Sequence, residues 1–305
     1  MPFNATWVWA LVVGATFFWG SNFNAAHSIA GAVSPLMAAA ERFAIAVVIL
    51  LAVRVWRGRA ESRLSLRQQV QLILLGLVGV FGFNYAFFTA LHTTSALNAA
   101  LIMALSPLLT ALLSSWLLGT ALPLRQLAGI LIAFVGVALV ITGGRLEVVR
   151  VAVGDAWMML ACVTWSFYSV LLKRYVGQVP SMQQARWTIS AGAFTLIALA
   201  LWIEQPLPVL AQQTLNTTLV LGYMALCGTV LAYIFWLQGV QKLGPQRAAI
   251  AFNLVPVFTL LINLVLGHWP QPEQFAGLLL VFAGVGVASG WRPRGNLRRK
   301  AVVVP

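Results

Sequence analysis

One stretch of 25 residues without a charged side chain, 95–119, constrains this chain more than any other feature of its sequence. A helix needs about 20 apolar residues to cross a lipid bilayer, so this stretch is long enough to span one. It carries Pro107 at its centre, and residues 99–107 recur as 248–256, which end on Pro256. A proline inside a helix removes one backbone hydrogen bond and kinks the helix. We expect two kinked membrane helices related by a repeat, with the kinks either serving as hinges beside a binding site or inherited by duplication for packing alone.

Composition places the rest of the chain in the same class. Of its 305 residues, 61% are hydrophobic and 8% are charged, whereas soluble domains carry about 25% charged residues. The sequence predicts an all-α, polytopic membrane protein. Cys162 and Cys227 lie inside apolar segments and are expected to be packing residues, so no metal and no cofactor is expected. Ten transmembrane helices are predicted, at 6–27, 33–56, 69–91, 95–119, 125–143, 154–176, 183–203, 215–238, 246–268 and 273–290.

Basic residues outside the predicted helices fall almost entirely on one side of the membrane. With both termini on the same side, fifteen Lys and Arg lie there and two, Arg145 and Arg150, lie opposite. The positive-inside rule then predicts cytoplasmic N- and C-termini. The basic tail 292–300 is expected to face anionic lipid, so the net charge of +13 is not interpreted as binding nucleic acid. The fifteen are Arg54, Arg57, Arg59, Arg63, Arg67, Arg125, Lys173, Arg174, Lys242, Arg247, Arg292, Arg294, Arg298, Arg299 and Lys300.

The repeat extends over the whole chain. Five helices in each copy is an odd number, so the second copy enters the membrane from the other side. Inverted repeats of this kind are typical of secondary transporters, whose site lies near the midplane between the copies. We therefore expect two five-helix repeats, 1–146 and 147–305, and a transport function. Matching residues lie at offsets of 144 to 148 positions: Trp19 and Trp165, Arg42 and Arg186, Tyr85 and Tyr233, Phe88 and Trp236, and 125–129 and 273–277.

Aromatic and amide side chains supply the candidate site. Residues i and i+3 share a helix face, and such pairs recur here at equivalent places in both copies. Apolar walls with a few polar groups are typical of pockets for small organic ligands, and a ring that faces an ammonium group contributes roughly 0.5–2 kcal/mol. The alternatives are a structural interface belt for the rings and interhelical hydrogen bonds for the amides. The candidate substrate-binding residues are Trp19, Asn22, Tyr85, Phe88, Asn98, Trp165, Tyr168, Tyr233, Trp236 and Asn253.

Gating and hinge roles are assigned to a second set, which comprises Glu41, Arg42, Pro107, Arg186 and Pro256. Of the six acids, Glu41 alone lies well inside a predicted helix, and the adjacent Arg42 does not share its helix face. Glu41 is expected either to be a structural or gating charge that meets Arg186 or substrate, or to carry protons. Pro107 and Pro256 are the candidate hinges. Two glycine sets, Gly76, Gly79 and Gly82 together with Gly277, Gly284 and Gly286, are expected to allow close helix approach.

Several short motifs, in this order, resemble EamA-type permeases of the drug/metabolite transporter superfamily: Trp19-Gly-Ser21, Glu41-Arg42-Phe43, Leu105-Ser-Pro107, and Gln126-x-x-Gly129 followed by Gly136. The resemblance covers roughly residues 6–290 and is greatest to the aromatic amino-acid exporter branch. It implies a ten-helix bundle in which helices 1–4 and 6–9 surround a central cavity, with helices 5 and 10 outside. It also implies export of amino acids and related metabolites across the bacterial inner membrane.

Three function classes follow. The first is a transporter that exports amino acids with aromatic or other apolar side chains, or related metabolites, or lets them pass, by alternating access. The second is a proton-coupled multidrug or quaternary-amine exporter that uses Glu41. An intramembrane enzyme or scaffold is the third, but no nucleophile–base pair, metal cluster or phosphate loop is found, so no enzyme activity is expected. A phosphate-ester carrier would need more cations than Arg42 and Arg186. The expected partners are a small-molecule substrate and the lipid bilayer, with the chain a monomer or weak homodimer.

Overall fold

The computed structural model describes residues 5–29, 31–58, 62–91, 93–94, 96–145, 147, 152–204, 213–267, 269 and 271–289. These residues form helices, and no strand is found among them. The helices are α1 (Ala5–Ser28), α2 (Pro35–Arg57), α3 (Leu66–Gly76), η1 (Leu77–Gly82), α4 (Phe83–Leu91), α5 (Ala96–Met103), α6 (Ser106–Leu118), α7 (Leu124–Thr142), α8 (Val153–Val176), α9 (Ser181–Ile203), α11 (Leu215–Tyr223), η3 (Met224–Leu231), α12 (Ala232–Leu243), α13 (Pro245–Ile250), η4 (Ala251–Leu254), α14 (Val255–Val265) and α15 (Pro272–Ser289).

Nine of the ten predicted spans are confirmed. Nine helical segments in the described part of the chain are long and apolar enough to cross a membrane. Helix α1 is the tenth: its 24 residues extend about 36 Å at 1.5 Å per residue, although Asn22 and Asn24 lower its hydropathy. The nine segments are Pro35–Trp56, Leu66–Ala90, Ala99–Leu118, Leu124–Thr142, Val153–Val176, Ser181–Ile203, Leu215–Leu243, Pro245–Val265 and Pro272–Ser289.

Four of the spans are interrupted, in pairs that match between the two halves. The fourth span breaks between α5 and α6, where Pro107 is in the first turn of α6. The ninth breaks at η4, a 3₁₀ segment, and Pro256 is in the first turn of α14. Proline fits a first turn because the backbone N–H there has no intrahelical partner. The third and eighth spans each contain a π-helical segment, η1 and η3, which the sequence did not predict.

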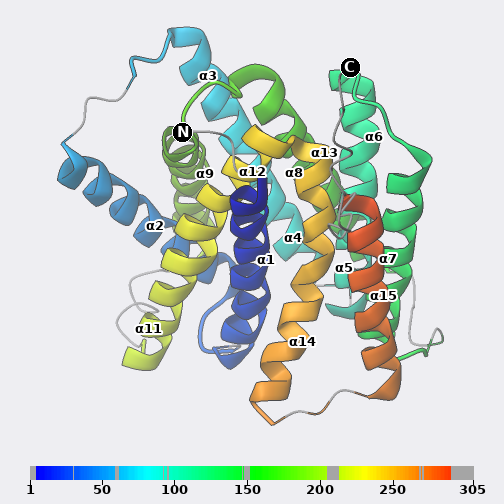
Figure 1. Cartoon of the computed structure of the whole chain (residues 1–305). Coiled ribbons are helices and arrows are strands. Elements are labelled where there is room, and N and C mark those ends of the chain that lie inside the picture. Colours follow the sequence, from blue (N-terminus) through cyan, green and yellow to red (C-terminus); the bar gives the residue numbers. More distant parts are fainter. Residues whose placement is uncertain are drawn as a thin grey trace, which may run out of the picture.

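The packing of the helices follows the same two-fold relation. Helix α1 packs against α12 and α14, and its counterpart α8 packs against α4 and α6 (Figure 1). Helix α2 packs against its own counterpart α9, and α7 against α15. Exchanging each helix for its counterpart therefore leaves these contacts unchanged. The predicted repeat boundary at residues 146 and 147 falls between α7 and α8 and stays a prediction.

Hydrogen bonds identify which helix ends meet. Ser62, after α2, exchanges two hydrogen bonds of 3.0 Å with Gln183 at the start of α9. The Lys173 ammonium at the end of α8 donates to the carbonyl oxygen of Gln241 in α12 at 2.5 Å. We call this end of the bundle the basic end, and the other the opposite end. That the basic end faces the cytoplasm stays a prediction, and the tail 292–300 lies outside the described residues.

Helices α7 and α15 pack closely against each other through glycine. A Cβ atom added at Gly129 would lie 2.4 Å from the backbone nitrogen of Ala288, and one added at Gly284 would lie 2.4 Å from that of Ala133. Real Cβ atoms essentially never approach within 3.0 Å, so only glycine permits this spacing. The expectation for Gly286 is wrong, because a Cβ there would meet nothing within 4 Å.

Of the three glycines in the third span, two face another helix and one does not. Gly76 lies against α9, where an added Cβ would be 2.4 Å from the carbonyl oxygen of Thr188. Gly79 lies against Tyr168 of α8. The expectation for Gly82 is wrong, because an added Cβ there would meet only the carbonyl oxygen of Leu77, in the same segment, at 3.2 Å. The glycines that allow close approach are thus those that face another helix.

Candidate functional site

Aromatic rings from both halves form one cluster in the middle of the bundle. Trp19 of α1 lies 5.4 Å from Trp165 of α8 and 5.3 Å from Trp236 of α12, measured between ring centroids. Tyr233 lies 6.2 Å from Trp19 and 5.8 Å from Trp165. Phe252, in η4, lies 5.6 Å from Trp19. We call Trp19, Trp165, Tyr233, Trp236 and Phe252 the aromatic cluster.

The cluster contains four of the ten residues that the sequence assigns to substrate binding, and a fifth adjoins it. Tyr168 lies 5.7 Å from Trp165, is fully buried, and shares a hydrogen bond of 3.2 Å with the Thr188 hydroxyl. Phe252 was not predicted. The sequence signal that could have found it is its position inside the recurring stretch, four residues before Pro256.

Tyr85 and Phe88 do not join the cluster. Tyr85 is 39% exposed and contacts Trp157 at 6.2 Å, and the ring of Phe88 contacts that of Phe87 at 5.7 Å. The reason is a one-residue difference after the π-helical segments. From Gly228 to Tyr233 is five residues, and five residues after Gly79 stands Asn84 rather than Tyr85.

Asn84 is thus a buried residue that the sequence analysis missed. It is 3% exposed, and its amide nitrogen donates to the carbonyl oxygen of Val80 at 2.6 Å. The Arg42 guanidinium donates to Asn84 Oδ1 at 3.3 Å, which joins α2 to α4. The ring of Phe43, which follows Arg42, lies 6.3 Å from that of Tyr233, so α2 contacts the aromatic cluster next to this bond.

The two halves make matching contacts at their π-helical segments. A Cβ atom added at Gly228 of η3 would lie 1.6 Å from Nδ2 of Asn22, and one added at Gly79 of η1 would lie 2.1 Å from Cγ of Tyr168. The indole N–H of Trp19 donates to the carbonyl oxygen of Gly228 at 3.0 Å. A π-helical turn disturbs the regular i→i+4 bonds, and such turns are frequent at functional sites.

Several buried polar atoms at or beside the cluster have no hydrogen-bond partner among the described residues. They are Nε1 of Trp165, Oδ1 of Asn22, and both amide atoms of Asn253, the residue that follows Phe252. These three side chains are 3%, 8% and 1% exposed. Leaving a buried polar group unsatisfied costs about 1–3 kcal/mol, so such atoms call for an ordered water, a ligand or a second conformation. The side chain of Asn98 lies outside the described part of the chain.

Glu41 and Arg186 lie toward opposite ends of the bundle. Glu41 Oε1 accepts a hydrogen bond of 2.6 Å from the amide of Gln213, just before α11. The carboxylate therefore joins α2 to the second half near the opposite end. Arg186 of α9 is 9% exposed. It stands in the second turn from the basic end, where α9 begins.

The basic end is closed by a polar clasp between the halves. Gln246 of α13 accepts a hydrogen bond from the Thr120 hydroxyl at 2.8 Å. Its amide nitrogen donates to the carbonyl oxygen of Ala121 at 3.1 Å and to Oε1 of Gln126 at 2.9 Å. The guanidinium of Arg174 also donates to the carbonyl oxygen of Leu117, near the end of α6.

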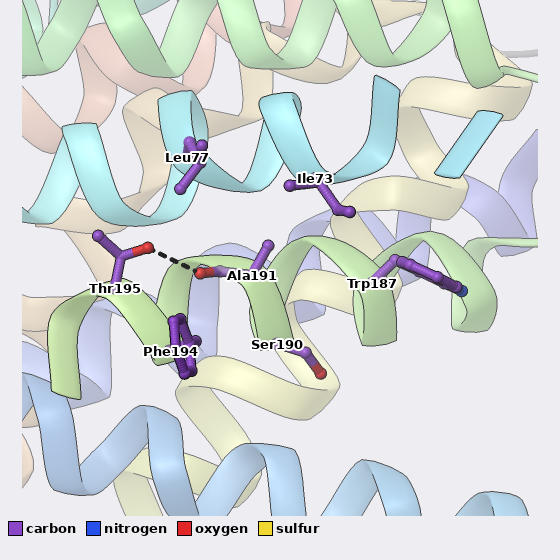
Figure 2. A pocket seen from close by; sticks show the side chains of 7 residues that line it. All are labelled: Ile73, Leu77, Trp187, Ser190, Ala191, Phe194 and Thr195. Carbon is purple, nitrogen blue, oxygen red and sulfur yellow. Dashed lines mark hydrogen bonds between the residues drawn. The ribbon is translucent and has the colours of Figure 1, made fainter. Parts of the chain in front are cut away.

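Two hollows in the described part of the chain lie outside the cluster. One, of about 340 Å³, lies between α9 and the third span and is apolar. Figure 2 shows Ile73 and Leu77 facing α9, with the Thr195 hydroxyl bonded to the Ala191 carbonyl of its own helix at 3.1 Å. The other hollow, of about 510 Å³, lies at the basic end beside Arg67 and Arg174. Neither includes a residue assigned to substrate binding.

Comparison with known proteins decides the family. The profile of the EamA-like transporter family matches residues 6–142 and again residues 152–290, one match for each set of five spans. The chain belongs to this family. The resemblance that the sequence motifs indicated is therefore confirmed.

Individual relatives agree. An uncharacterized transporter of Bacillus subtilis, YyaM, is 36% identical over 93% of this chain and 93% of its own length. The aromatic amino acid exporter YddG of Ancylobacter novellus is 26% identical over 92% and 96%. The inner membrane transporter YedA of Escherichia coli K12, also uncharacterized, is 28% identical over 89% and 87%. With its many apolar helices, the chain is a multi-pass transporter of the inner membrane.

The fold is shared with a solved structure. One crystal structure superposes on this chain with a TM-score of 0.80, covering 94% of this chain and 97% of the other at 24% sequence identity. At that identity the likeness concerns the fold alone.

Proposed function

We propose that this EamA-family transporter exports amino acids with aromatic or other apolar side chains, or related small metabolites, or lets them pass, by alternating access around the aromatic cluster. The observation that carries the proposal is a cluster of rings, drawn from both halves, that adjoins buried polar atoms with no hydrogen-bond partner in the described part of the chain. The 26% identical relative named an aromatic amino acid exporter supports the same class of cargo.

The polar atoms fit an amino acid in chemical kind. An α-carboxylate needs donors, which the indole N–H of Trp165 and the amide nitrogen of Asn253 supply. An α-ammonium group needs acceptors, which Oδ1 of Asn22 and the faces of the rings supply. An apolar side chain would stack among the rings that now contact one another. In this structure those rings fill the centre, so substrate entry requires them to separate.

The breaks at Pro107 and Pro256 are the proposed hinges for that separation. Each stands where a span is already divided into two helices. The polar clasp of Gln246 holds the basic end of the ninth span against the fourth. Alternating access would release this clasp and close the opposite end.

The hydrogen bond of Glu41 and the positions of the other acids support facilitated diffusion or weakly coupled export rather than proton-driven transport. Among the described residues, the other acids, Asp155, Glu204, Glu273 and Glu147, stand within the first turn of a helix or outside helices. Glu41 accepts a hydrogen bond from Gln213, which fits a structural or gating charge. The alternative is a proton-coupled multidrug or quaternary-amine exporter in which Glu41 carries the proton.

The test is flux of radiolabelled amino acids in proteoliposomes without an ion gradient. The panel comprises tryptophan, phenylalanine, methionine, threonine and glutamate. We expect saturable flux of several zwitterionic amino acids, reduced at least tenfold by Trp165→Ala. The matched control is Trp202→Ala, because Trp202 of α9 is 88% exposed and lies outside the cluster. No amino-acid flux, with transport of lipophilic cations only under a pH gradient, would replace this proposal with the multidrug alternative.

A further inference from the structure

The two halves of the bundle are alike in sequence and packing but differ at one pair of indoles. Trp19 and Trp165 are counterparts in the two halves, and both belong to the aromatic cluster. Trp19 donates its N–H to the carbonyl oxygen of Gly228 at 3.0 Å. Nε1 of Trp165 is buried and has no partner among the described residues.

The acceptor that Trp165 would use is identified by the same relation. Gly228 belongs to η3, and its counterpart in η1 is Gly79. Both glycines receive the helix that carries the indole: Asn22, three residues after Trp19, lies on Gly228, and Tyr168, three residues after Trp165, lies on Gly79. In both halves, the helix that carries the indole is thus already packed against the glycine. Only the Trp19 indole has formed its hydrogen bond.

A second difference between the halves concerns how closely helices pack at the two ends of the bundle. At the basic end, α6 packs closely against α13, and Gln246 bonds to residues that follow α6. The counterpart pair at the opposite end is α14 and α5, and within the described residues these two are not closely packed. The structure is therefore closed at the basic end and looser at the other.

In an inverted repeat, such an asymmetry indicates how one access state converts into the other. If each half adopts the conformation that the other half now has, the bundle closes at the opposite end and opens at the basic end. Contacts that are unequal in this structure are then exchanged. Contacts that are equal, such as those of Gly79 and Gly228, are kept.

We infer that the two indoles are alternating latches: Trp19 bonds to Gly228 when the basic end is closed, and Trp165 bonds to Gly79 when the opposite end is closed. Each latch joins the first helix of one half to a π-helical segment of the other half. Tyr168, three residues after Trp165, already lies against Gly79, so α8 is packed beside the proposed acceptor before the second bond forms. The inference rests on the alternating-access part of the proposed function and not on its cargo.

The test measures the ratio of the two states by spin-label distances, without substrate, in lipid nanodiscs. One label pair replaces Ser115 and Arg247, both exposed, to report the basic end. A second replaces Thr93 and Val265, both exposed, to report the opposite end. Cys162 and Cys227, the free cysteines, are replaced by alanine. Three variants keep an aromatic ring and remove one indole N–H each: Trp19→Phe, Trp165→Phe and Trp202→Phe.

The expected change in the ratio of the two access states differs between the three variants. A net hydrogen bond of about 1 kcal/mol corresponds to a roughly fivefold change in an equilibrium ratio. Trp19→Phe should shift the ratio about fivefold toward opening of the basic end, and Trp165→Phe should shift it about fivefold the other way. Trp202→Phe is the control, because Trp202 of α9 is 88% exposed and lies outside the aromatic cluster. It should leave the ratio unchanged.

The outcomes separate this inference from the proposed cargo. Shifts of the same sign for Trp19→Phe and Trp165→Phe, or no shift for Trp19→Phe, would overturn the latches. An equal shift for Trp202→Phe would overturn them as well, because it would show a general effect of losing an indole. Absence of amino-acid flux in proteoliposomes would contradict the cargo and leave the distance result as it stands.

Discussion

The pairing of α7 with α15 yields a prediction whose size can be worked out from distances. In Gly284→Ala, the new Cβ would lie 2.4 Å from the Ala133 nitrogen and 2.7 Å from the Gly129 carbonyl oxygen. Ordinary contact begins at 3.4 Å, so the helices must separate locally by about 1 Å. Overpacking of this kind costs about 1–3 kcal/mol, and alanine recovers about 0.5–1 kcal/mol through helix propensity.

Comparison with Gly286→Ala separates the packing cost in Gly284→Ala from the gain in helix propensity. Gly286 stands on the same helix two residues later, where an added Cβ meets nothing within 4 Å. Both variants gain the same propensity, so the difference between them is the packing cost of about 1–3 kcal/mol. That difference corresponds to roughly 2–10 °C in the midpoint of thermal unfolding, measured by intrinsic fluorescence in detergent micelles. Equal midpoints for the two variants would refute the close pairing of α7 and α15.

Three further predictions concern the site. Tyr85→Ala should lower amino-acid flux less than threefold, in contrast to Trp165→Ala, because Tyr85 is 39% exposed beside Trp157; an equal loss would place it in the substrate path. Glu41→Gln should leave the pH dependence of flux unchanged, since a glutamine oxygen can accept the bond from Gln213; loss of pH-driven flux with binding intact would make Glu41 the proton carrier. Gln246→Ala should raise hydrogen–deuterium exchange of the α13 amides at least fivefold, because three bonds between α13 and the first half are lost; unchanged exchange would contradict the clasp.

The sequence predicts the spans well because their signal is strong and local. A run such as 95–119 has one stable arrangement in a bilayer, and Pro107 marks the break within it. The recurrence of that run also predicts the inverted repeat and, with the other motifs, the family. The residues that gather in the cluster from α1, α8 and α12 are predicted for the same reason, because regular helices keep i and i+3 on one face.

The third span departs from that rule, although the eighth span also contains a π-helical segment. Tyr233 stands five residues after Gly228 but Tyr85 stands six residues after Gly79, so Asn84 rather than Tyr85 takes the place that Tyr233 has in the other half. Nothing in the sequence marks a π-helical turn, so Tyr85 and Phe88 look equivalent to Tyr233 and Trp236. The partner of Glu41 could not be predicted either, because Gln213 comes from outside the spans.

The most direct test of the central claim is whether an amino acid contacts the aromatic cluster. The protein would be labelled with 5-fluorotryptophan, and the ¹⁹F resonances of Trp165, Trp19 and Trp202 assigned by single Trp→Phe variants. On titration with L-phenylalanine, the account predicts saturable shifts of the Trp165 and Trp19 resonances and none for Trp202, which is 88% exposed. Resonances of Trp165 and Trp19 that stay fixed while flux is saturable would contradict it, because the substrate would then cross elsewhere.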